Sequence, residues 1–161
     1  MPLVFLGLGS NVGDCAATIR TAFDRLSAGV LDGSRLSRLY RTRPMYVEGQ
    51  PDFVNAVAAG QSRLEPRELL EAVNRIEAEF GRDRSREEPK GPRSLDVDIL
   101  LYGSLVLDEP GLSIPHIGLV ERRFALVPLL ELESGLRDPR SGASYADILA
   151  ALPEQGIYLL G

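Results

Sequence analysis

The sequence GPRSLDVDILLY, residues 91–102, decides the fold. From Leu95 onward it alternates with a period of two, which predicts a β-strand with one face packed on a core. One face of this strand carries Leu95, Val97, Ile99 and Leu101. The other face carries Asp96, Asp98, Leu100 and Tyr102.

Asp96 and Asp98 are the chemically informative pair in this strand. Strand geometry places two such carboxylates about 6.5 to 7 Å apart, where they repel each other and gain from a divalent cation. Mg²⁺ prefers carboxylate oxygens and usually shares itself with substrate phosphates. Basic residues that could bind phosphate lie just upstream: Arg82, Arg84, Arg86, Lys90 and Arg93. The pattern therefore predicts a phosphoryl-transfer site, with a merely solvated strand face as the alternative.

Composition limits the remaining possibilities. A chain of 161 residues with 44% hydrophobic and 25% charged residues is predicted to form a single globular domain, residues 1–161. The net charge of −5 argues against general nucleic-acid binding. Cys15 is the single cysteine, so no internal disulfide can form, and no apolar run is long enough for a membrane span. We expect a cytoplasmic monomer that binds neither nucleic acid nor membrane and is complete as a stand-alone protein.

The elements predicted upstream complete an α+β fold. They are a strand at 2–8, a helix capped by Asp14 and stopped by Gly29, strands at 34–42 and 53–64, and a helix from Pro66 that ends at Gly81. With the strand that bears Asp96, the order is βαββαβ, which predicts a ferredoxin-like antiparallel sheet with both helices on one face. C-terminal additions follow: a short hairpin partner at 104–107, helices after His116, a helix at 145–152 and an edge strand.

Two common nucleotide-binding motifs are disfavoured. Gly7–Gly13 matches G-x-G-x-x-x-G, but the second predicted strand is followed by a third without an intervening helix, unlike a Rossmann fold. Lys90 is followed by Gly91 and Pro92, so it does not belong to a P-loop. A nucleotide would have to be held by a metal and arginines.

Several further side chains have two readings. His116, the single histidine, is either structural or a hydrogen-bond donor to phosphate, and Arg122 could lie on a solvated helix face. Arg82 and Arg84 could simply complement the helix C-terminus before them. Phe53 and Phe124 would by default belong to the core. Asn55 shares a strand face with Phe53, and an amide beside an aromatic ring can recognise a flat heterocycle.

The chain resembles the 6-hydroxymethyl-7,8-dihydropterin pyrophosphokinases of folate synthesis. The resemblance rests on GPRSLDVDILLYG at 91–103, and on further pieces in the same order: GSN at 9–11, YRT at 40–42 with Pro44, QPDFVNA at 50–56, RIE at 75–77 with Gly81 and Arg82, PH at 115–116, and Arg122 with Phe124 and PL at 128–129. It implies transfer of pyrophosphate from ATP to the pterin hydroxymethyl group, with release of AMP.

The resemblance also implies roles for individual residues. Two Mg²⁺ ions would bind Asp96 and Asp98, while Arg82 and Arg93 would neutralise charge during transfer. The ATP site would contain Asn74, Glu77, Arg84, Arg93, Ile99, Ser113, His116 and Arg122. The pterin would stack between Phe53 and Phe124, with its edge read by Thr42, Pro44, Asn55 and Asp96. Loops 43–51 and 82–93 would close over the substrates.

Four positions depart from the resembled family. Arg43 stands where Pro is common, and Lys90 replaces an aromatic residue before Gly91. Ile117 stands where Tyr is frequent, and Gly111 replaces a basic residue. These changes weaken the phosphate contacts implied by resemblance but not the metal site. Two other functions stay open: a different D-x-D nucleotidyl or glycosyl transferase, and a ferredoxin-like binding module without activity.

Overall fold

The computed structural model describes residues 1–43, 49–81 and 94–160. In the first half of the chain the elements are β1 (Leu3–Ser10), α1 (Cys15–Gly29), β2 (Leu31–Leu36), β3 (Tyr40–Thr42), β4 (Phe53–Ser62) and α2 (Pro66–Glu79). In the second half they are β5 (Asp96–Tyr102), β6 (Leu107–Glu109), β7 (Leu112–Ile114), the short 3-10 helix η1 (Leu119–Glu121), α3 (Arg123–Leu132), α4 (Tyr145–Ala151) and β8 (Ile157–Leu159).

A six-stranded sheet forms the centre of the described structure. Its order is β5-β1-β4-β3-β8, with β2 also paired to β4. Every strand pair is antiparallel, which confirms the predicted α+β class with an antiparallel sheet. β6 and β7 form a separate two-stranded sheet.

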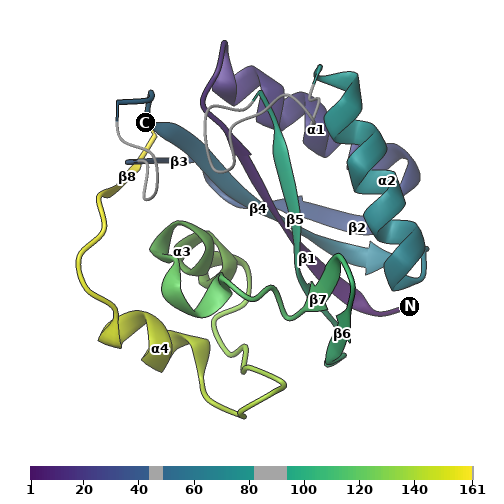
Figure 1. Cartoon of the computed structure of the whole chain (residues 1–161), viewed down its shortest axis with the longest axis vertical. Helices are drawn as coiled ribbons and strands as arrows, with labels where there is room; N and C mark the ends of the chain where they lie inside the picture. Colours follow the sequence, from purple (N-terminus) through teal and green to yellow (C-terminus); the bar gives the residue numbers. More distant parts are fainter. Residues whose placement is uncertain (44–48, 82–93, 161) are drawn as a thin grey trace.

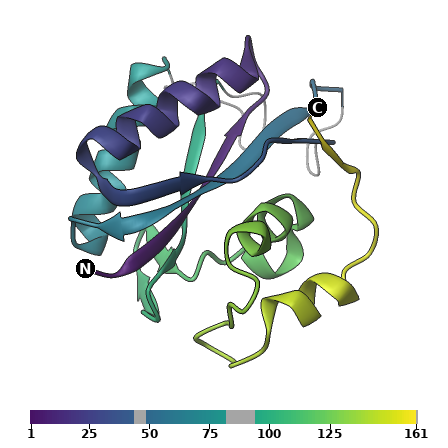
Figure 2. The same cartoon turned by 180° about the vertical axis from the view of Figure 1, so that it is seen from behind.

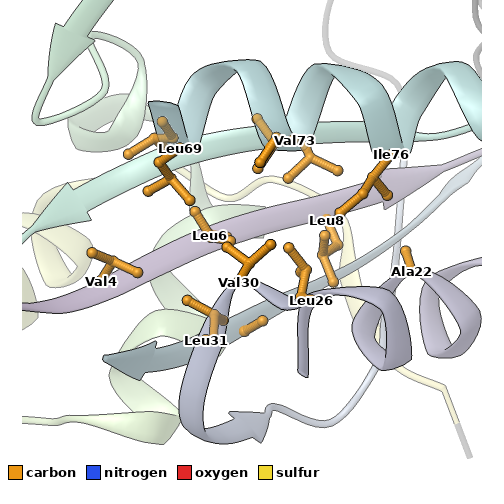
Figure 3. Packing of buried hydrophobic residues seen from close by; sticks show 14 of the residues in the cluster. Val4, Leu6, Leu8, Ala22, Leu26, Val30, Leu31, Leu69, Val73 and Ile76 are labelled. Carbon is orange, nitrogen blue, oxygen red and sulfur yellow. The ribbon is translucent and has the colours of Figure 1, made fainter. Parts of the chain in front are cut away.

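Helices cover both faces of the sheet (Figure 1 and, from behind, Figure 2). α1 and α2 lie on one face, where Leu26 and Val73 pack against Leu6 of β1 in the larger core (Figure 3). α3 and α4 lie on the other face, where Leu126 joins Phe5 in a second core. Because β1 is buried on both faces, its apolar run is continuous rather than alternating.

The second predicted strand is divided in the structure. β2 begins at Leu31 and ends at Leu36, and β3 covers only Tyr40–Thr42, so a single strand at 34–42 was wrong. Ser37 lies between them and exchanges two 2.9 Å hydrogen bonds with Val57: the Ser37 backbone N–H donates to the Val57 carbonyl, and the Val57 N–H donates to Ser37 Oγ. A side chain thus replaces one strand contact, which the alternation pattern cannot express.

The alternation along β5 holds only as far as Ile99. Phe5 of β1 pairs with Leu101 and Leu6 pairs with Ile99, so Leu100 is the extra residue of a β-bulge. Leu100 and Leu101 consequently both belong to the core beneath α3, while Tyr102 belongs to the core beneath α1 and α2. The predicted faces of Leu101 and Tyr102 were therefore wrong.

Some ends of the elements follow their local sequence and others differ from it; β1, for example, continues to Ser10 and β4 already ends at Ser62. Asp14 caps α1 by accepting the Ala17 N–H at 3.2 Å, and Gly81 follows α2 with a φ of 81°, both as predicted. Gly29, expected to stop α1, is instead its last residue. The strand expected at 104–107 begins at Leu107 and pairs with β7.

The C-terminal helix and edge strand were predicted, and β8 pairs with β3. Among the described residues, no helix is both long enough and apolar enough to span a membrane.

Candidate active site

A cavity of about 230 Å³ opens between the sheet and the N-terminal end of α3. Its floor is formed by Gly7 and Gly9 of β1. Asp96 of β5 pairs with Gly9 from one side, and Asn55 of β4 pairs with Gly9 from the other. Cross-strand partners point to the same face, so the carboxylate and the amide face the cavity on either side of a residue without a side chain. Neighbouring strands are about 4.8 Å apart, which leaves room for a flat ligand above Gly9.

Gly9 also permits the close approach of Asn55. A Cβ atom at this position would lie 2.9 Å from Asn55 Oδ1. We name the two flanks of this glycine the carboxylate side, formed by Asp96, Asp98 and His116, and the aromatic side, formed by Thr42, Phe53, Asn55 and Phe124; all seven residues line the cavity.

On the carboxylate side, His116 lies beside Asp98. Its backbone N–H donates to the carbonyl of Leu100 at 3.0 Å, which holds the segment after β7 along β5. Its Nδ1 accepts the Gly118 N–H at 3.0 Å, so Nε2 carries the proton of the neutral ring. His116 Nε2 is 3.7 Å from Asp98 Oδ1.

Burial lowers the pKa of His116, and Arg122 lowers it further, while Asp96 acts in the opposite direction. A neutral imidazole near neutral pH can donate one hydrogen bond from Nε2 to an anionic ligand without adding a charge. The cavity placement favours a ligand-binding role over a purely structural one.

On the aromatic side, an amide and two phenylalanine rings line the same cavity. Asn55 is 7% exposed and donates from Nδ2 to Thr42 Oγ1 at 2.6 Å, and Thr42 is 3% exposed. This bond orients the amide so that its polar edge faces the cavity rather than turning freely. Phe53 and Phe124 line the cavity with it, and the guanidinium of Arg122 lies over the Phe124 ring, 5.6 Å from its centroid.

Several cavity residues were given no individual role from the sequence, among them Arg43, Gln50 and Leu119. Gln50 is held by Asn11, whose Nδ2 donates to Gln50 Oε1 at 2.8 Å and to the Pro51 carbonyl at 3.0 Å. Asn11 is 3% exposed although it follows a strand in a turn. Such burial depends on contacts about forty residues away, so the local pattern carried no signal for it.

Four of the residues expected to bind ATP are not among those that line this cavity. Ile99 is 5% exposed in the core beneath α1 and α2, and Glu77 is 2% exposed, with Oε2 accepting the Val97 N–H at 2.9 Å. That bond fixes the start of β5 to α2, as does the 2.7 Å bond donated by Ser94 Oγ to the Phe80 carbonyl. Asn74 is exposed on α2 and Ser113 is half-buried on β7. The cavity thus unites Asp96, Asp98, His116 and Arg122, but not these four.

Pro44, Arg82, Arg84 and Arg93 lie outside the described residues, as does Lys90. Their expected roles, which are to bind the pterin and ATP and to neutralise charge during transfer, therefore stay predictions.

The described residues contain no group of three or more histidine, cysteine or acidic side chains placed to hold a metal ion. A two-carboxylate site is nevertheless what Mg²⁺ requires when substrate phosphates supply further oxygens. Asp96 and Asp98 offer hard oxygen donors on one strand face and line one cavity. The residues present therefore fit an ion that arrives together with a phosphate ligand.

Comparison with known proteins matches residues 5–134 to the family described as 7,8-dihydro-6-hydroxymethylpterin-pyrophosphokinase. A protein of Pseudomonas aeruginosa named 2-amino-4-hydroxy-6-hydroxymethyldihydropteridine pyrophosphokinase is 42% identical over 96% of this chain and 94% of its own length. The protein of that name from Haemophilus influenzae is 39% identical over 88% of both chains. The folic acid synthesis protein fol1 of Schizosaccharomyces pombe is 42% identical over 98% of this chain, which spans only 21% of fol1.

Solved structures support the fold. The structure titled Plasmodium falciparum HPPK-DHPS wild type with SDX-DHP matches 93% of this chain with a TM-score of 0.68, at 14% identity and over 43% of its own chain. This chain thus spans about a fifth of some relatives and under half of such structures, but most of the two bacterial pyrophosphokinases. The match over residues 5–134, with 42% identity to a bacterial relative along nearly its whole length, means that this chain belongs to the 7,8-dihydro-6-hydroxymethylpterin-pyrophosphokinase family.

Proposed function

We propose that this chain transfers the pyrophosphoryl group of ATP to the hydroxymethyl oxygen of 6-hydroxymethyl-7,8-dihydropterin, a step of folate biosynthesis. One observation carries the proposal: a single cavity is lined by both carboxylates of β5 and by an amide and two phenylalanines. The family membership and the names of the bacterial relatives agree with it.

The reaction requires one bond to form and one to break. The pterin hydroxyl oxygen attacks the β-phosphorus, and the bond from that phosphorus to the oxygen bridging to the α-phosphorus breaks. That oxygen leaves with AMP, and the hydroxyl proton is released to a base or to water. A transfer of this kind needs little covalent chemistry from the protein, so positioning and charge stabilisation dominate.

The aromatic side would hold the pterin. Phe53 and Phe124 supply apolar faces for a flat ring, and Asn55 can read the hydrogen-bonding edge of that ring because Thr42 fixes its amide. Gly9 leaves the space between Asn55 and Asp96 open, so a ring on the amide can direct its hydroxymethyl group towards the carboxylate.

The carboxylate side would receive the phosphates. Mg²⁺, for which two ions are expected, would be held by Asp96 and Asp98 and would offset charge on phosphoryl oxygens. Neutral His116 would donate from Nε2 to a phosphate oxygen, and Arg122 would supply positive charge beside the Phe124 ring. Asp96 borders both sides and is the candidate acceptor of a hydrogen bond from the pterin hydroxyl. Arg82 and Arg93 would add cations during transfer.

The finer structural assignments are part of the same proposal. We assign the ferredoxin-like class because β5-β1-β4 with β2 and β3 has the strand order of that fold once β2 and β3 count as one divided strand. One domain over residues 1–161 is supported by two cores that share a single sheet. A monomer and a cytoplasmic location remain predictions, the first testable by light scattering during size-exclusion chromatography.

The decisive experiment identifies the nucleotide product. The protein is incubated with ATP, Mg²⁺ and the hydroxymethyl dihydropterin, beside Asp98→Asn and the control Asp24→Asn, which alters an exposed acid on α1. We expect AMP only when the pterin is present, unchanged in Asp24→Asn and nearly absent in Asp98→Asn. Formation of ADP would contradict the proposal, and so would ATP binding without turnover in a folded protein.

A further inference from the structure

Cavity residues lie at the start of α3, which lacks a local side-chain cap. Arg122 precedes α3 with an extended backbone (φ −120°, ψ 102°), and its side chain does not cap the helix. Phe124 follows two residues later. The first backbone N–H groups of any helix lack intrahelical partners, and a turn without a cap frays. Local backbone bonds run from the Ala125 and Leu126 N–H groups to the Arg122 carbonyl, which leaves the Arg123 N–H to a partner outside the helix.

Gln155 supplies the missing cap from the C-terminal segment. Its Oε1 accepts the Arg123 N–H at 2.9 Å, and its Nε2 donates to the Glu121 carbonyl at 3.0 Å. One amide side chain thus holds the backbone on both sides of Arg122. The partners are more than thirty residues apart in sequence, and Gln155 lies beyond the region matched to the family.

The segment that carries Gln155 is itself fixed by α3. The guanidinium of Arg123 donates from Nε to the Pro153 carbonyl and from Nη2 to the Leu152 carbonyl, both at 2.9 Å. Leu152 is the C-terminal cap of α4, where a cation is favourable. The backbone N–H of Arg123 therefore binds Gln155, and its guanidinium binds Leu152 and Pro153 of the same segment. The start of α3 and this segment thus hold each other in place.

The same segment continues to β3, which carries other cavity residues. The carbonyl of Gly156 accepts the Arg43 N–H at 3.1 Å, and Ile157 pairs with Thr42 in the β3–β8 ladder. Arg43 and Thr42 line the cavity, as do Arg122 and Phe124 at the start of α3. Three consecutive residues, 155–157, thus connect these two pairs of cavity residues (the C-terminal segment crosses from α4 to β8 in Figure 1).

We propose that Gln155 is a positioning residue for substrate binding: by capping α3 and holding the backbone around Arg122, it fixes Arg122 and Phe124 relative to Thr42 and Arg43. The substrates named in this inference rest on the proposed function, whereas the hydrogen bonds of Gln155 do not depend on it. Gln155 does not line the cavity, so it acts through the backbone of α3 and not by touching a ligand.

The test compares three substitutions in the full chain. Gln155→Leu removes both hydrogen bonds at nearly constant size, and Gln155→Glu keeps an acceptor for the Arg123 N–H but loses the donor to Glu121. Glu154→Leu is the control, because it places the same leucine at the neighbouring exposed position. All assays are run well below the melting temperature of every variant, so that unfolding does not contribute.

We expect Gln155→Leu to raise the KM for the pterin by about five- to tenfold, the loss that follows when one or two ordinary hydrogen bonds no longer order a binding group. The value of kcat should change by less than about twofold, because Asp96 and Asp98 on β5 are untouched. Gln155→Glu should recover most of the loss, and Glu154→Leu should match the wild type. A pterin KM in Gln155→Leu equal to that of the control, with or without a lower melting temperature, would overturn the proposal, as would equal impairment in Gln155→Glu and Gln155→Leu.

A second readout separates this inference from the proposed function. The Arg122 Nε–H and Phe124 ring signals in NMR spectra of the ligand-free protein report their order directly. We expect them to shift or broaden in Gln155→Leu and not in Glu154→Leu, even if the wild type makes no AMP. Unchanged signals would overturn the positioning role irrespective of the reaction. Absence of AMP with shifted signals would reject the proposed function alone.

Discussion

The carboxylate side and the aromatic side of the cavity face each other across Gly9 but are assembled differently. On the carboxylate side, both acids come from one strand, β5, which is held by β1 beside it and by Glu77 of α2, and His116 is bound to the same strand through its N–H to the Leu100 carbonyl. Thr42, Asn55 and Phe124 come from three separate elements, β3, β4 and α3. Residues supplied by one strand are placed by that strand's own geometry. Residues from several elements are placed only when the contacts between these elements form.

This difference predicts different failures. A substitution on the carboxylate side should remove chemistry without loosening the fold, because the strand stays paired. A substitution on the aromatic side, or in the contacts behind it, should weaken pterin binding and stability together.

The largest effect is expected on the carboxylate side. Asp98→Asn should lower kcat/KM by about 10²- to 10³-fold, the usual loss when one electrostatic group of an active site is removed. The melting temperature should stay within a few degrees of the wild type, because Asp98 is half-buried and the amide has the same shape. Steady-state kinetics and thermal unfolding of the same preparation test both parts. A large loss of stability would show that the carboxylate side also supports the fold, contrary to this prediction.

On the aromatic side, Phe124→Ala should raise the KM for the pterin by about tenfold or more, since stacking of an aromatic side chain on a base is worth roughly 1–3 kcal/mol. The KM for ATP should rise less, although Arg122 loses the ring beneath it. Phe124→Tyr preserves the aromatic face and serves as the matched variant. Equal increases in both KM values would mean that Phe124 does not belong to the pterin side.

The floor between the two sides gives a smaller expected effect. Gly9→Ala would place a Cβ atom 2.9 Å from Asn55 Oδ1, so the amide must move by a few tenths of an ångström and its 2.6 Å bond to Thr42 must stretch. We expect the Kd of the pterin to rise by about three- to tenfold, comparable to the loss of one hydrogen bond. Isothermal titration with the pterin alone measures this directly. Gly13→Ala is an unsuitable comparison because Gly13 has a φ of 77°, whereas Gly29→Ala meets no atom within 4 Å and is the better control.

The sequence predicted the carboxylate side more fully than the aromatic side for the same physical reason. The alternation along β5 placed Asp96 and Asp98 on one face without reference to any other element. It failed at Leu100, because a bulge depends on how β1 pairs with β5. Phe53 and Asn55 could be placed on one face of their strand, but only the resemblance brought Phe124 to them.

Contacts made by single side chains across the chain were beyond the sequence pattern altogether. Glu77, which the resemblance places in the ATP site, accepts the Val97 N–H in the interior, a contact that the sequence did not predict. Gln155 and Asn11 are polar residues in irregular segments, and nothing in their surroundings along the chain distinguishes them from solvated ones. Their partners are over thirty residues away, so only the folded structure reveals them.

The smallest effect on catalysis is expected from weakening the contact between α3 and β3, on which the placement of the aromatic side depends. Glu131 of α3 accepts hydrogen bonds from the Tyr40 hydroxyl at 2.6 Å, from the Arg38 N–H at 2.9 Å and from Arg38 Nε at 3.3 Å. Burial raises the pKa of Glu131, but the hydrogen bonds from Tyr40 and Arg38 outweigh this and the net shift is downward. The ionised carboxylate therefore favours the folded state.

Glu131→Gln should lower the free energy of unfolding at neutral pH by about 1–2 kcal/mol, because bonds to a charged acceptor are stronger than those to an amide. A carboxyl whose folded pKa is depressed contributes stability that is present above its unfolded pKa, near 4.5, and lost as pH falls through the folded value. The difference between wild type and variant should therefore be constant above about pH 5.5 and shrink as pH falls below the unfolded pKa. Urea unfolding at pH 7 and pH 3.5 measures it. The pterin KM should rise by only about twofold, because Gln155 still holds the other end of α3. If the difference in stability were the same at pH 3.5 as at pH 7, the charge of Glu131 would not be its cause.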